Sequence, residues 1–196
     1  MERWPADAPH IAAAVGRLRQ GAVIAFPTDT LYAVAARAAD SAALRRLYEV
    51  KHRPPGQQMI WLVKDATQVE LVAEVSSTAA DLMGRFWPGP LTLVLPARDA
   101  RDSSTIAFRA PDHPVALALL EQLDEPVASS SANRAGEPPP TDATQVEARL
   151  GDTIDIILDG GPCRIGQPST ILDLSGTAPR ILREGAIPAA KLRAGG

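Results

Sequence analysis

Four clusters of polar side chains in this sequence follow short apolar runs or helical patterns, where a chain can present groups to a ligand. They are Pro27-Thr28-Asp29-Thr30 with Tyr32, Lys51-His52-Arg53-Pro54-Pro55, Ser129-Ser130-Ser131-Ala132-Asn133, and Pro168-Ser169-Thr170. Hydroxyl, amide and carboxylate groups suit a small polar ligand, and the second cluster suits a triphosphate, with Arg53 as a planar fork and Lys51 as a point charge. The same residues also form ordinary turns and helix caps, so both interpretations stay open at this point.

Two arginines interrupt apolar segments that otherwise have the pattern of buried strands. Arg109 follows an Ile-Ala-Phe run, and Arg183 follows an Ile-Leu pair. A charge in such a run lies either at a sheet edge in water or inside a cleft with an anionic partner. For Arg109 the nearby Asp112 is also an available partner. The residues alone therefore leave edge, cleft and local ion pair open.

The side-chain sets used in covalent and metal catalysis are missing from this sequence. The three histidines, His10, His52 and His113, show no metal-ligand spacing such as H-x-x-x-H, and there is no G-x-S-x-G nucleophile motif. The glycines near Ser169 match neither the P-loop nor the dinucleotide fingerprint. We therefore expect no metal site made by the protein alone, and a chemistry that depends on positioning and charge.

Composition narrows the class of protein further. The chain has 196 residues, of which 45% are hydrophobic and only 4% aromatic, so we expect one domain with an aliphatic core. A net charge of −3 argues against coating nucleic acid by bulk charge but permits a local basic cleft. The sequence has no long apolar run, no signal-peptide pattern and a single cysteine, Cys163, so we expect no membrane contact and a cytoplasmic location.

The spacing of apolar residues predicts helices that alternate with strands at first, after which strands dominate. Asp7, either Asp40 or Ser41, and either Thr141 or Asp142 are suited to begin helices. The expected helices cover about 8–20, 41–51, 78–86, 113–123 and 142–150, and the expected strands cover 22–26, 59–63, 91–95, 105–109, 127–129, 154–158, 170–174 and 180–182. This order predicts a single α/β domain over residues 1–196, with a core of about 8–187 and a twisted mixed β-sheet flanked by helices.

Taken in order, the clusters and the runs between them resemble the YrdC-like family. The segments that carry the resemblance are 21–32 (GAVIAFPTDTLY), 51–54 (KHRP), 86–92 (FWPGPLT), 105–114 (TIAFRAPDHP), 131–133 (SAN) with Gly136 and 140–141 (PT), 159–161 (DGG) with 168–170 (PST), and 181–187 (ILREGAI). Each segment alone is a weak signal, but seven in the family's order are specific and span nearly the whole chain. The last segment lies near the end of the sequence, so the chain resembles the short form of the family.

The resemblance implies a fold and an activity. The fold is a twisted mixed sheet with helices around a concave, locally positive cleft. The activity is that of an L-threonylcarbamoyladenylate synthase, in which threonine and bicarbonate form a carbamate whose oxygen attacks the α-phosphorus of ATP, and pyrophosphate leaves. Mg²⁺ would accompany the ATP. A separate transferase would then pass the product to an adenosine beside the anticodon of some tRNAs.

Carried over motif by motif, the resemblance also assigns roles to residues of this chain. Threonine would be bound by Thr28, Arg109, Ser129 and Ser169, with Arg109 on its carboxylate. ATP would be bound by Lys51, Arg53, Thr105, Ser131, Asn133 and Arg183, and Lys51 and Arg53 would be the catalytic pair. The sequence departs from the family where Ala33-Val34-Ala35 replaces the usual Gly-Leu-Gly, and where Gln58-Met59 replaces Pro-Leu.

Two other functions are compatible with the same resemblance. In the first, the protein is a relative that binds RNA or nucleotide without forming the adenylate, and it binds tRNA weakly. The net charge of −3 and the few aromatic side chains on which bases could stack disfavour this function. The other is a carbamoyl-transfer module like that of hydrogenase-maturation proteins. Those are longer chains with zinc-finger-like cysteines, which this sequence lacks. The synthase is therefore the leading hypothesis.

Overall fold

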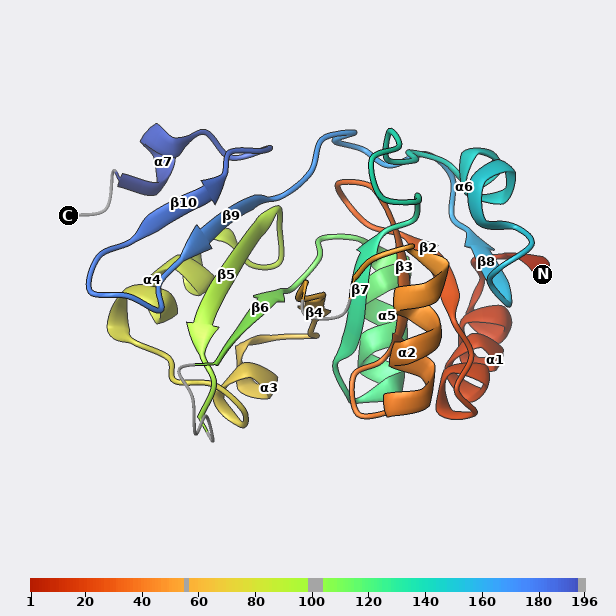
Figure 1. Ribbon diagram of the computed structural model, residues 1–196, viewed down its shortest axis with the longest axis horizontal. Coiled ribbons are helices and arrows are strands. Elements are labelled where there is room, and N and C mark those ends of the chain that lie inside the picture. The colour runs from red at the N-terminus through yellow and green to blue at the C-terminus, as the bar shows by residue number, and fades with distance from the viewer. Residues whose placement is uncertain (55–56, 99–103, 194–196) are drawn as a thin grey trace.

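A ten-stranded mixed sheet organises the protein, and helices pack against it (Figure 1). The computed structural model describes residues 1–54, 57–98 and 104–193. In order across the sheet, the strands are β1 (Glu2–Pro5), β8 (Ile156–Asp159), β2 (Ile24–Pro27), β3 (Tyr32–Arg37), β7 (Val127–Ser131), β4 (Ile60–Leu62), β6 (Thr105–Arg109), β5 (Leu91–Pro96), β9 (Thr170–Asp173) and β10 (Arg180–Arg183). The helices are α1 (Ala8–Arg19), α2 (Ser41–Val50), α3 (Ala66–Glu70), α4 (Ser77–Phe86), α5 (Pro114–Leu123), α6 (Ala143–Leu150) and α7 (Ala189–Arg193).

The short strand β4 joins two halves of this sheet. It pairs antiparallel with β7 on one side and parallel with β6 on the other. We call β1, β8, β2, β3 and β7 the β3 half, and β6, β5, β9 and β10 the β5 half. Each half contains parallel pairs, such as β8 with β2 and β9 with β5, beside antiparallel pairs, such as β3 with β7 and β9 with β10. The mixed sheet predicted from the order of the elements is therefore confirmed.

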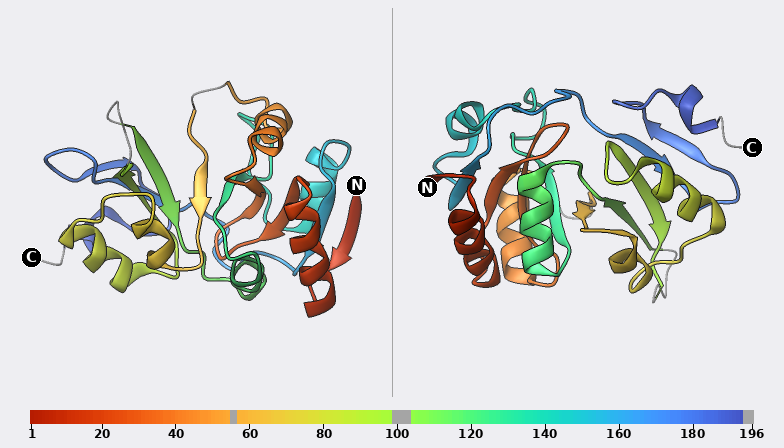
Figure 2. Two further views of the ribbon diagram at one scale, coloured as in Figure 1. Left: turned by 90° about the horizontal axis from the view of Figure 1, so that it is seen from below. Right: turned by 180° about the vertical axis from the view of Figure 1, so that it is seen from behind.

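Helices cover both faces of the β3 half. Helices α1 and α5 pack on one face, where Phe26 and Leu119 belong to the same buried cluster (Figure 2). Helices α2 and α6 pack on the opposite face, where Leu47 and Ile157 share a second cluster. Because β2 and β8 are buried on both sides, their sequences are almost continuously apolar. This half is a rigid frame that positions the ends of β2, β3 and β7.

The β5 half buries one face against α3 and α4 and turns the other toward a cavity. Leu93 on β5 and Phe108 on β6 lie in the cluster under α4, whereas their neighbours Val94, Ala107 and Arg109 line the cavity. Successive residues of a strand point to opposite faces, so an apolar strand can present single selected side chains on its other face. The charged Arg109 at the end of an apolar run is such a side chain.

The helix caps predicted from the sequence are present. Asp7, Asp40 and Asp142 each accept hydrogen bonds from backbone N–H groups in the first turn of α1, α2 and α6. The structure adds β1, β3, α3 and α7, which the apolar spacing did not predict. Strand β1 lies before the expected core of 8–187, and it pairs with β8 at the edge of the sheet. None of the helices in the described residues has the length and hydropathy needed to cross a membrane.

Candidate active site

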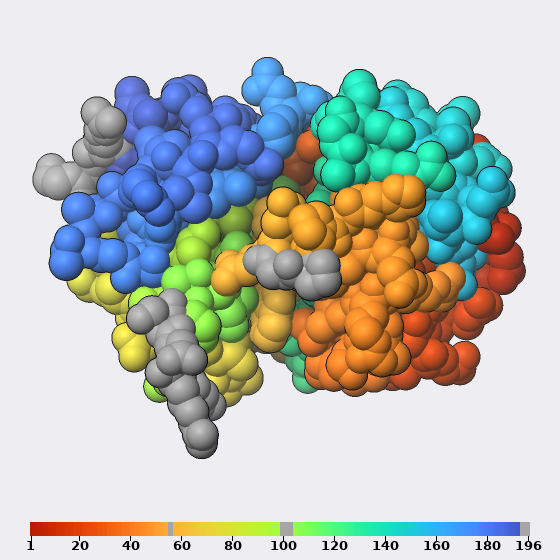
Figure 3. Space-filling model, viewed as in Figure 1, coloured from red at the N-terminus to blue at the C-terminus, as the bar shows by residue number. Residues whose placement is uncertain are grey.

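A cavity of about 410 Å³ lies over β4, where the two halves of the sheet meet. Figure 3 shows this face: the opening lies between the blue C-terminal strands, the orange segment that follows α2 and the green-to-cyan segment that follows β7. Eight of the residues predicted for the site line the cavity: Thr28, Arg53, Arg109, Ser129, Ser131, Asn133, Ser169 and Arg183. Segments that are distant in the sequence are therefore brought to one concave surface.

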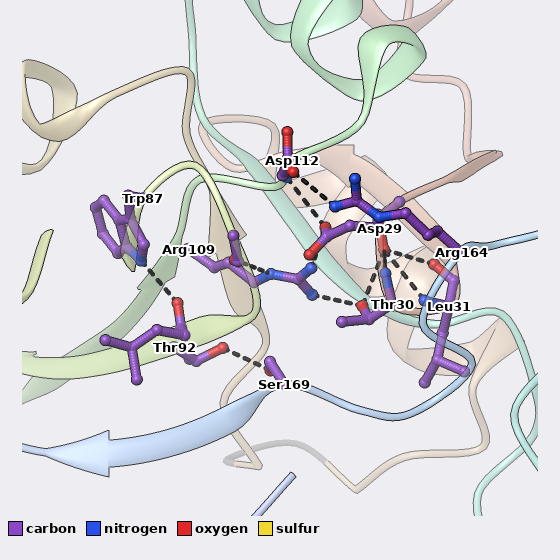
Figure 4. A network of polar contacts seen from close by, with 12 residues as sticks. Asp29, Thr30, Leu31, Trp87, Thr92, Arg109, Asp112, Arg164 and Ser169 are labelled. Atoms are coloured by element: carbon purple, nitrogen blue, oxygen red, sulfur yellow. Dashed lines mark hydrogen bonds and ion pairs between the residues drawn. The ribbon is translucent and has the colours of Figure 1, made fainter. Parts of the chain in front are cut away.

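Arg109 forms the buried end of this cavity, and it is held on three sides (Figure 4). Its Nε donates to the carbonyl of Gly89 at 3.0 Å, its Nη1 donates to Thr30 Oγ1 at 2.7 Å, and its Nη2 forms an ion pair with Asp29. Arg109 is only 5% exposed, and Asp29 is completely buried. The local ion pair with Asp112 that the sequence left open does not form. Asp112 instead pairs with Arg164 at 2.6 Å.

The Arg109 guanidinium keeps part of its donor capacity. Three of its five N–H groups have acceptors, so each Nη retains one N–H without an acceptor among the described residues. Burial lowers the pKa of Arg109, and the charge of Asp29 opposes that shift. Because the ordinary pKa of arginine is so high, the group remains charged. It therefore has two further N–H donors for an anion.

The Thr28 loop is a turn that closes on itself. Thr28 Oγ1 donates to the carbonyl of Leu31 at 2.7 Å and accepts from the N–H of Thr30 at 3.2 Å, which is the turn chemistry considered from the sequence. The segment 160–169, which we call the crossover segment, fixes this loop from outside. There, the N–H of Ile165 donates to Asp29 O at 2.9 Å, and that of Gly166 donates to Thr30 O at 3.0 Å.

Two buried serines complete the wall near Arg109. Ser129 Oγ donates to the carbonyl of Ile60 at 3.0 Å, which ties β7 to β4. Ser169 Oγ lies 2.8 Å from Thr92 Oγ1, so the crossover segment is also tied to β5. Both serines are 3% exposed. These bonds fix the position of both serines at the cavity wall.

Two further arginines lie toward the mouth of the cavity and have no carboxylate partner among the described residues. Arg53 is half-buried, and its donors meet Gln57 Oε1 at 3.1 Å and Ser130 Oγ at 3.5 Å. Arg183 is exposed, and its Nε and Nη2 both donate to the carbonyl of Ser169, at 3.1 and 2.9 Å. Neutral acceptors leave the charge of both groups available to an anionic ligand.

Lys51 and Thr105, which were also predicted for the ATP site, do not line the cavity. The Lys51 ammonium donates to the backbone carbonyls of Ser131, at 2.5 Å, and Asn133. Thr105 begins β6, and its carbonyl accepts from Gln58 Nε2 at 2.6 Å. Gln58 does line the cavity, so Thr105 borders the site through this side chain. The roles assigned to Lys51 and Thr105 stay predictions.

The cavity wall also contains residues to which the sequence assigned no individual role: Gln58, Glu137 and Leu182, together with Thr30, Tyr32 and Ser130 of the polar clusters. Tyr32 is fully buried and donates from its hydroxyl to the carbonyl of Gly161 at 2.8 Å, and burial raises its pKa. Glu137 is the one carboxylate among the described lining residues, beside three arginines. Its position four residues after Asn133, in a Gly/Pro-rich loop, gave no pattern that would have marked it.

The departure at Ala33 and Ala35 is accommodated by regular strand geometry. Both residues belong to β3, where they pair with Ser131 and Ser129 of β7. Among the non-glycine residues that the structure describes, only His52 and Asp124 have positive φ. Alanine therefore meets no backbone strain at either position, and Ala33 contributes its methyl group to the cavity wall.

Fold and cavity together define an α/β protein with a cavity over its sheet, which has one arginine at its buried end and two toward its mouth. Comparison with known proteins makes this class more specific. The family model Sua5_yciO_yrdC, described as "Telomere recombination", matches residues 16–185. The chain belongs to this Sua5/YciO/YrdC family.

Two curated relatives of this chain have names that refer to threonylcarbamoyl-AMP synthesis. A threonylcarbamoyl-AMP synthase of Bacillus subtilis (strain 168) is 42% identical over 95% of this chain, which spans 56% of that protein's length. A putative threonylcarbamoyl-AMP synthase of Mycobacterium tuberculosis is 40% identical over 90% of this chain and 84% of its own length. The crystal structure of P. abyssi Sua5 complexed with L-threonine matches with a TM-score of 0.90 and 39% identity, over 97% of this chain and 58% of that one.

Proposed function

We propose that this protein is an L-threonylcarbamoyladenylate synthase that converts L-threonine, bicarbonate and ATP to L-threonylcarbamoyl-AMP and pyrophosphate. The observation that carries the proposal is the buried Arg109, which lines the cavity together with Arg53 and Arg183 and retains two N–H groups without a described acceptor. A planar carboxylate matches two parallel N–H donors, and phosphate oxygens match the arginines at the mouth. These features support a cavity that would bind an amino acid at its buried end and a nucleotide at its mouth.

The threonine end follows from the buried contacts. The carboxylate of threonine would accept from the two remaining N–H groups of Arg109. Thr28, Ser129 and Ser169 would line the pocket around the rest of the amino acid. Because Asp29 and Thr30 already orient the guanidinium, little conformational freedom has to be lost on binding. The amine of threonine would then react with bicarbonate to give the carbamate and water.

The ATP end would lie toward the mouth of the cavity. Arg53 and Arg183 would bind phosphate oxygens, and Ser131 and Asn133 would contact the nucleotide from the end of β7. The carbamate oxygen would attack the α-phosphorus while the bond to the β-phosphate breaks. Negative charge then passes to the leaving pyrophosphate, where the arginines stabilise it. The protein supplies positioning and charge in this reaction, and the substrate supplies the nucleophile.

The residues present fit a Mg²⁺ ion that arrives with ATP. Mg²⁺ usually keeps several waters and binds one or two carboxylates together with substrate phosphates. Within the described residues no group of three or more His, Cys, Asp or Glu side chains could hold a metal, but Glu137 places one carboxylate on the cavity wall. Glu137 is therefore the protein group that would lie beside the ion, which would neutralise triphosphate charge.

Release of pyrophosphate tests the proposal. We expect it to require threonine, bicarbonate, ATP and Mg²⁺ together and to need no tRNA, with L-threonylcarbamoyl-AMP identified by mass spectrometry. Full turnover without bicarbonate would contradict the synthase. An absolute requirement for tRNA, or tRNA retention in a gel-shift assay without any adenylate, would favour an RNA-binding relative. In the proposed role, a separate transferase would consume the product in tRNA modification, in the cytoplasm.

A further inference from the structure

The side chain of Lys51 is buried between the end of α2 and the end of β7. Lys51 is 3% exposed, and its ammonium donates to the carbonyl of Ser131 at 2.5 Å and to the carbonyl of Asn133. It is absent from the described lining of the cavity, although Ser131 and Asn133, whose carbonyls it bonds, are present there. The ammonium of Lys51 is therefore bonded to backbone oxygens of the protein and does not extend into the cavity.

The two carbonyls belong to a tight turn. The N–H of Asn133 donates to Ser131 O at 2.9 Å, and the N–H of Ala135 donates to the carbonyl of Lys51 itself at 3.2 Å. Asn133 Nδ2 donates to the carbonyls of Arg134 and Glu137, each at 2.8 Å. Lys51 is thus bonded to this turn at both its ammonium and its backbone. We call residues 131–137 the β7 turn.

The β7 turn presents three of its side chains, those of Ser131, Asn133 and Glu137, to the cavity. Backbone carbonyls that converge on one point repel each other unless a donor lies between them, and an ammonium is a strong donor for that purpose. Removing the ammonium would leave two buried carbonyls without this partner. The shape of the β7 turn therefore depends on Lys51.

Arg53 provides the contrast within the same motif. It lies two residues further along the chain and lines the cavity, and its Nη1 reaches Ser130 Oγ at 3.5 Å. Its contacts are with neutral side chains, so replacing them with bonds to a phosphate would cost little free energy. Of the two cations in this motif, Arg53 has the placement of a phosphate ligand and Lys51 has the placement of a structural cation.

We propose that Lys51 is a positioning residue, which shapes the β7 turn so that Ser131 and Asn133 fit the nucleoside portion and α-phosphate of ATP, and that it makes no contact with the β- and γ-phosphates. The proposal rests on the proposed function, because it concerns the nucleotide end of the same cavity. It gives different roles to two residues of one motif. Arg53 binds the triphosphate of ATP, and Lys51 binds backbone carbonyls of the β7 turn.

The experiment compares the affinities for ATP and AMP, each measured by calorimetry with Mg²⁺, in wild type, Lys51→Met and Arg53→Ala. Lys51→Met should weaken ATP and AMP binding by the same factor, about tenfold, because the turn serves both ligands. Arg53→Ala should weaken ATP by a similar or larger factor and leave AMP nearly unchanged. The ATP-to-AMP affinity ratio therefore stays constant in the first variant and falls in the second.

Two outcomes would overturn the assignment. A fall in the ATP-to-AMP ratio in Lys51→Met would place the ammonium on the outer phosphates. Unchanged affinity for both nucleotides would show that the β7 turn does not depend on Lys51. Failure of the proposed function is a separate result, because it would appear as the absence of threonine-dependent pyrophosphate release from the wild-type protein, whatever the nucleotide affinities are.

A measurement on the wild-type protein keeps the proposal testable if Lys51→Met does not fold. Burial lowers the pKa of Lys51 to about 8; the positive charge of Arg53 adds to this shift, and the negative charge of Glu137 opposes it. Opening of the β7 turn exposes Lys51 to water, where its ordinary pKa of 10.5 returns, so above pH 8 the open state binds the extra proton and the closed turn becomes relatively more stable. Amide exchange of Asn133 and Ala135, corrected for the intrinsic pH dependence, should therefore slow as pH rises from about 8 toward 10.5. Constant protection across this range would contradict a positioning role for the ammonium.

Discussion

The two ends of the cavity hold their arginines in opposite ways. Arg109 is 5% exposed and is paired with the fully buried Asp29, whereas Arg53 and Arg183 lie toward the mouth and meet only neutral acceptors among the described residues. A buried guanidinium requires a resident counter-ion, because an unpaired charge in the interior is very costly. At the mouth, water can fill that role until a ligand arrives. The Arg109 end of the cavity is therefore preorganised, and the mouth is not.

The difference predicts that mutations at the buried end will affect folding as well as binding, while mutations at the mouth will affect binding alone. Asp29→Ala should have the largest effect. It leaves Arg109 without its counter-ion and is expected to lower the free energy of unfolding by about 3–5 kcal/mol and to abolish threonine binding. Urea unfolding and calorimetry measure the two effects. Asp112→Ala is the matched control, because its partner Arg164 is exposed, and it should leave stability nearly unchanged.

Lys51 tests whether a buried cation without a carboxylate partner also limits stability. Its folded-state pKa of about 8 lies below the ordinary value of 10.5, so between these pH values the unfolded chain binds the extra proton and stability rises with pH. Relative to Lys51→Met, the wild-type protein should gain on the order of 3 kcal/mol between about pH 8 and 10.5.

Urea unfolding of both proteins at several pH values measures this difference. Lys64→Met is the matched control, because Lys64 bonds Asp124 and its pKa is raised, so it should show no such gain in this window. A parallel pH dependence of wild type and Lys51→Met would contradict the burial effect.

Arg53→Ala removes one of the two cations at the mouth of the cavity. A charge-assisted hydrogen bond to phosphate contributes about 1.5–3 kcal/mol, so ATP affinity should fall roughly 10- to 150-fold. The melting temperature should hardly change, because Arg53 contacts only neutral groups near the surface. Arg45→Ala, an exposed change on α2 outside the described lining, serves as the control for both measurements. A large drop in melting temperature would show that Arg53 is a structural helix cap.

Arg109→Lys should give the smallest effect of the series. An ammonium keeps the charge opposite Asp29, so the fold should survive, but it cannot present two parallel donors to a carboxylate. We expect the KM for threonine to rise about tenfold while the KM for ATP changes much less. Equal rises for both substrates would argue against a dedicated carboxylate site at this end.

The sequence predicted the positions of the site residues better than it predicted their contacts. Polar clusters at strand ends indicated which side chains would meet, and eight of them line one cavity. The partners of the cations could not be predicted, because they are distant in the sequence. Asp29 lies 80 residues from Arg109, and the carbonyls that bind Lys51 lie 80 and 82 residues away. The sequence suggested only the local candidate Asp112.

Missed elements have a similar physical explanation. Strand β3 has the sequence Tyr-Ala-Val-Ala-Ala-Arg, and alanine has little preference for strands, so its conformation is imposed by pairing with β2 and β7. Helices α3 and α7 have five residues each, too few for an apolar period to be visible. The long, amphipathic and capped helices were predicted because their signals are local.

The position of β8 in the sheet has a consequence for synthesis of the chain. This strand lies between β1 and β2, although about 130 residues separate it from β2 along the chain, and β9 follows only after the crossover segment. Strand β1 has no other partner in the described sheet. A nascent chain that ends before the crossover segment thus lacks the hydrogen bonds that fix the Thr28 loop. It also lacks the part of the cavity wall that contains Ser169. Such late closure of long-range pairs slows folding, and ligand recognition should arise only in the last stage of translation.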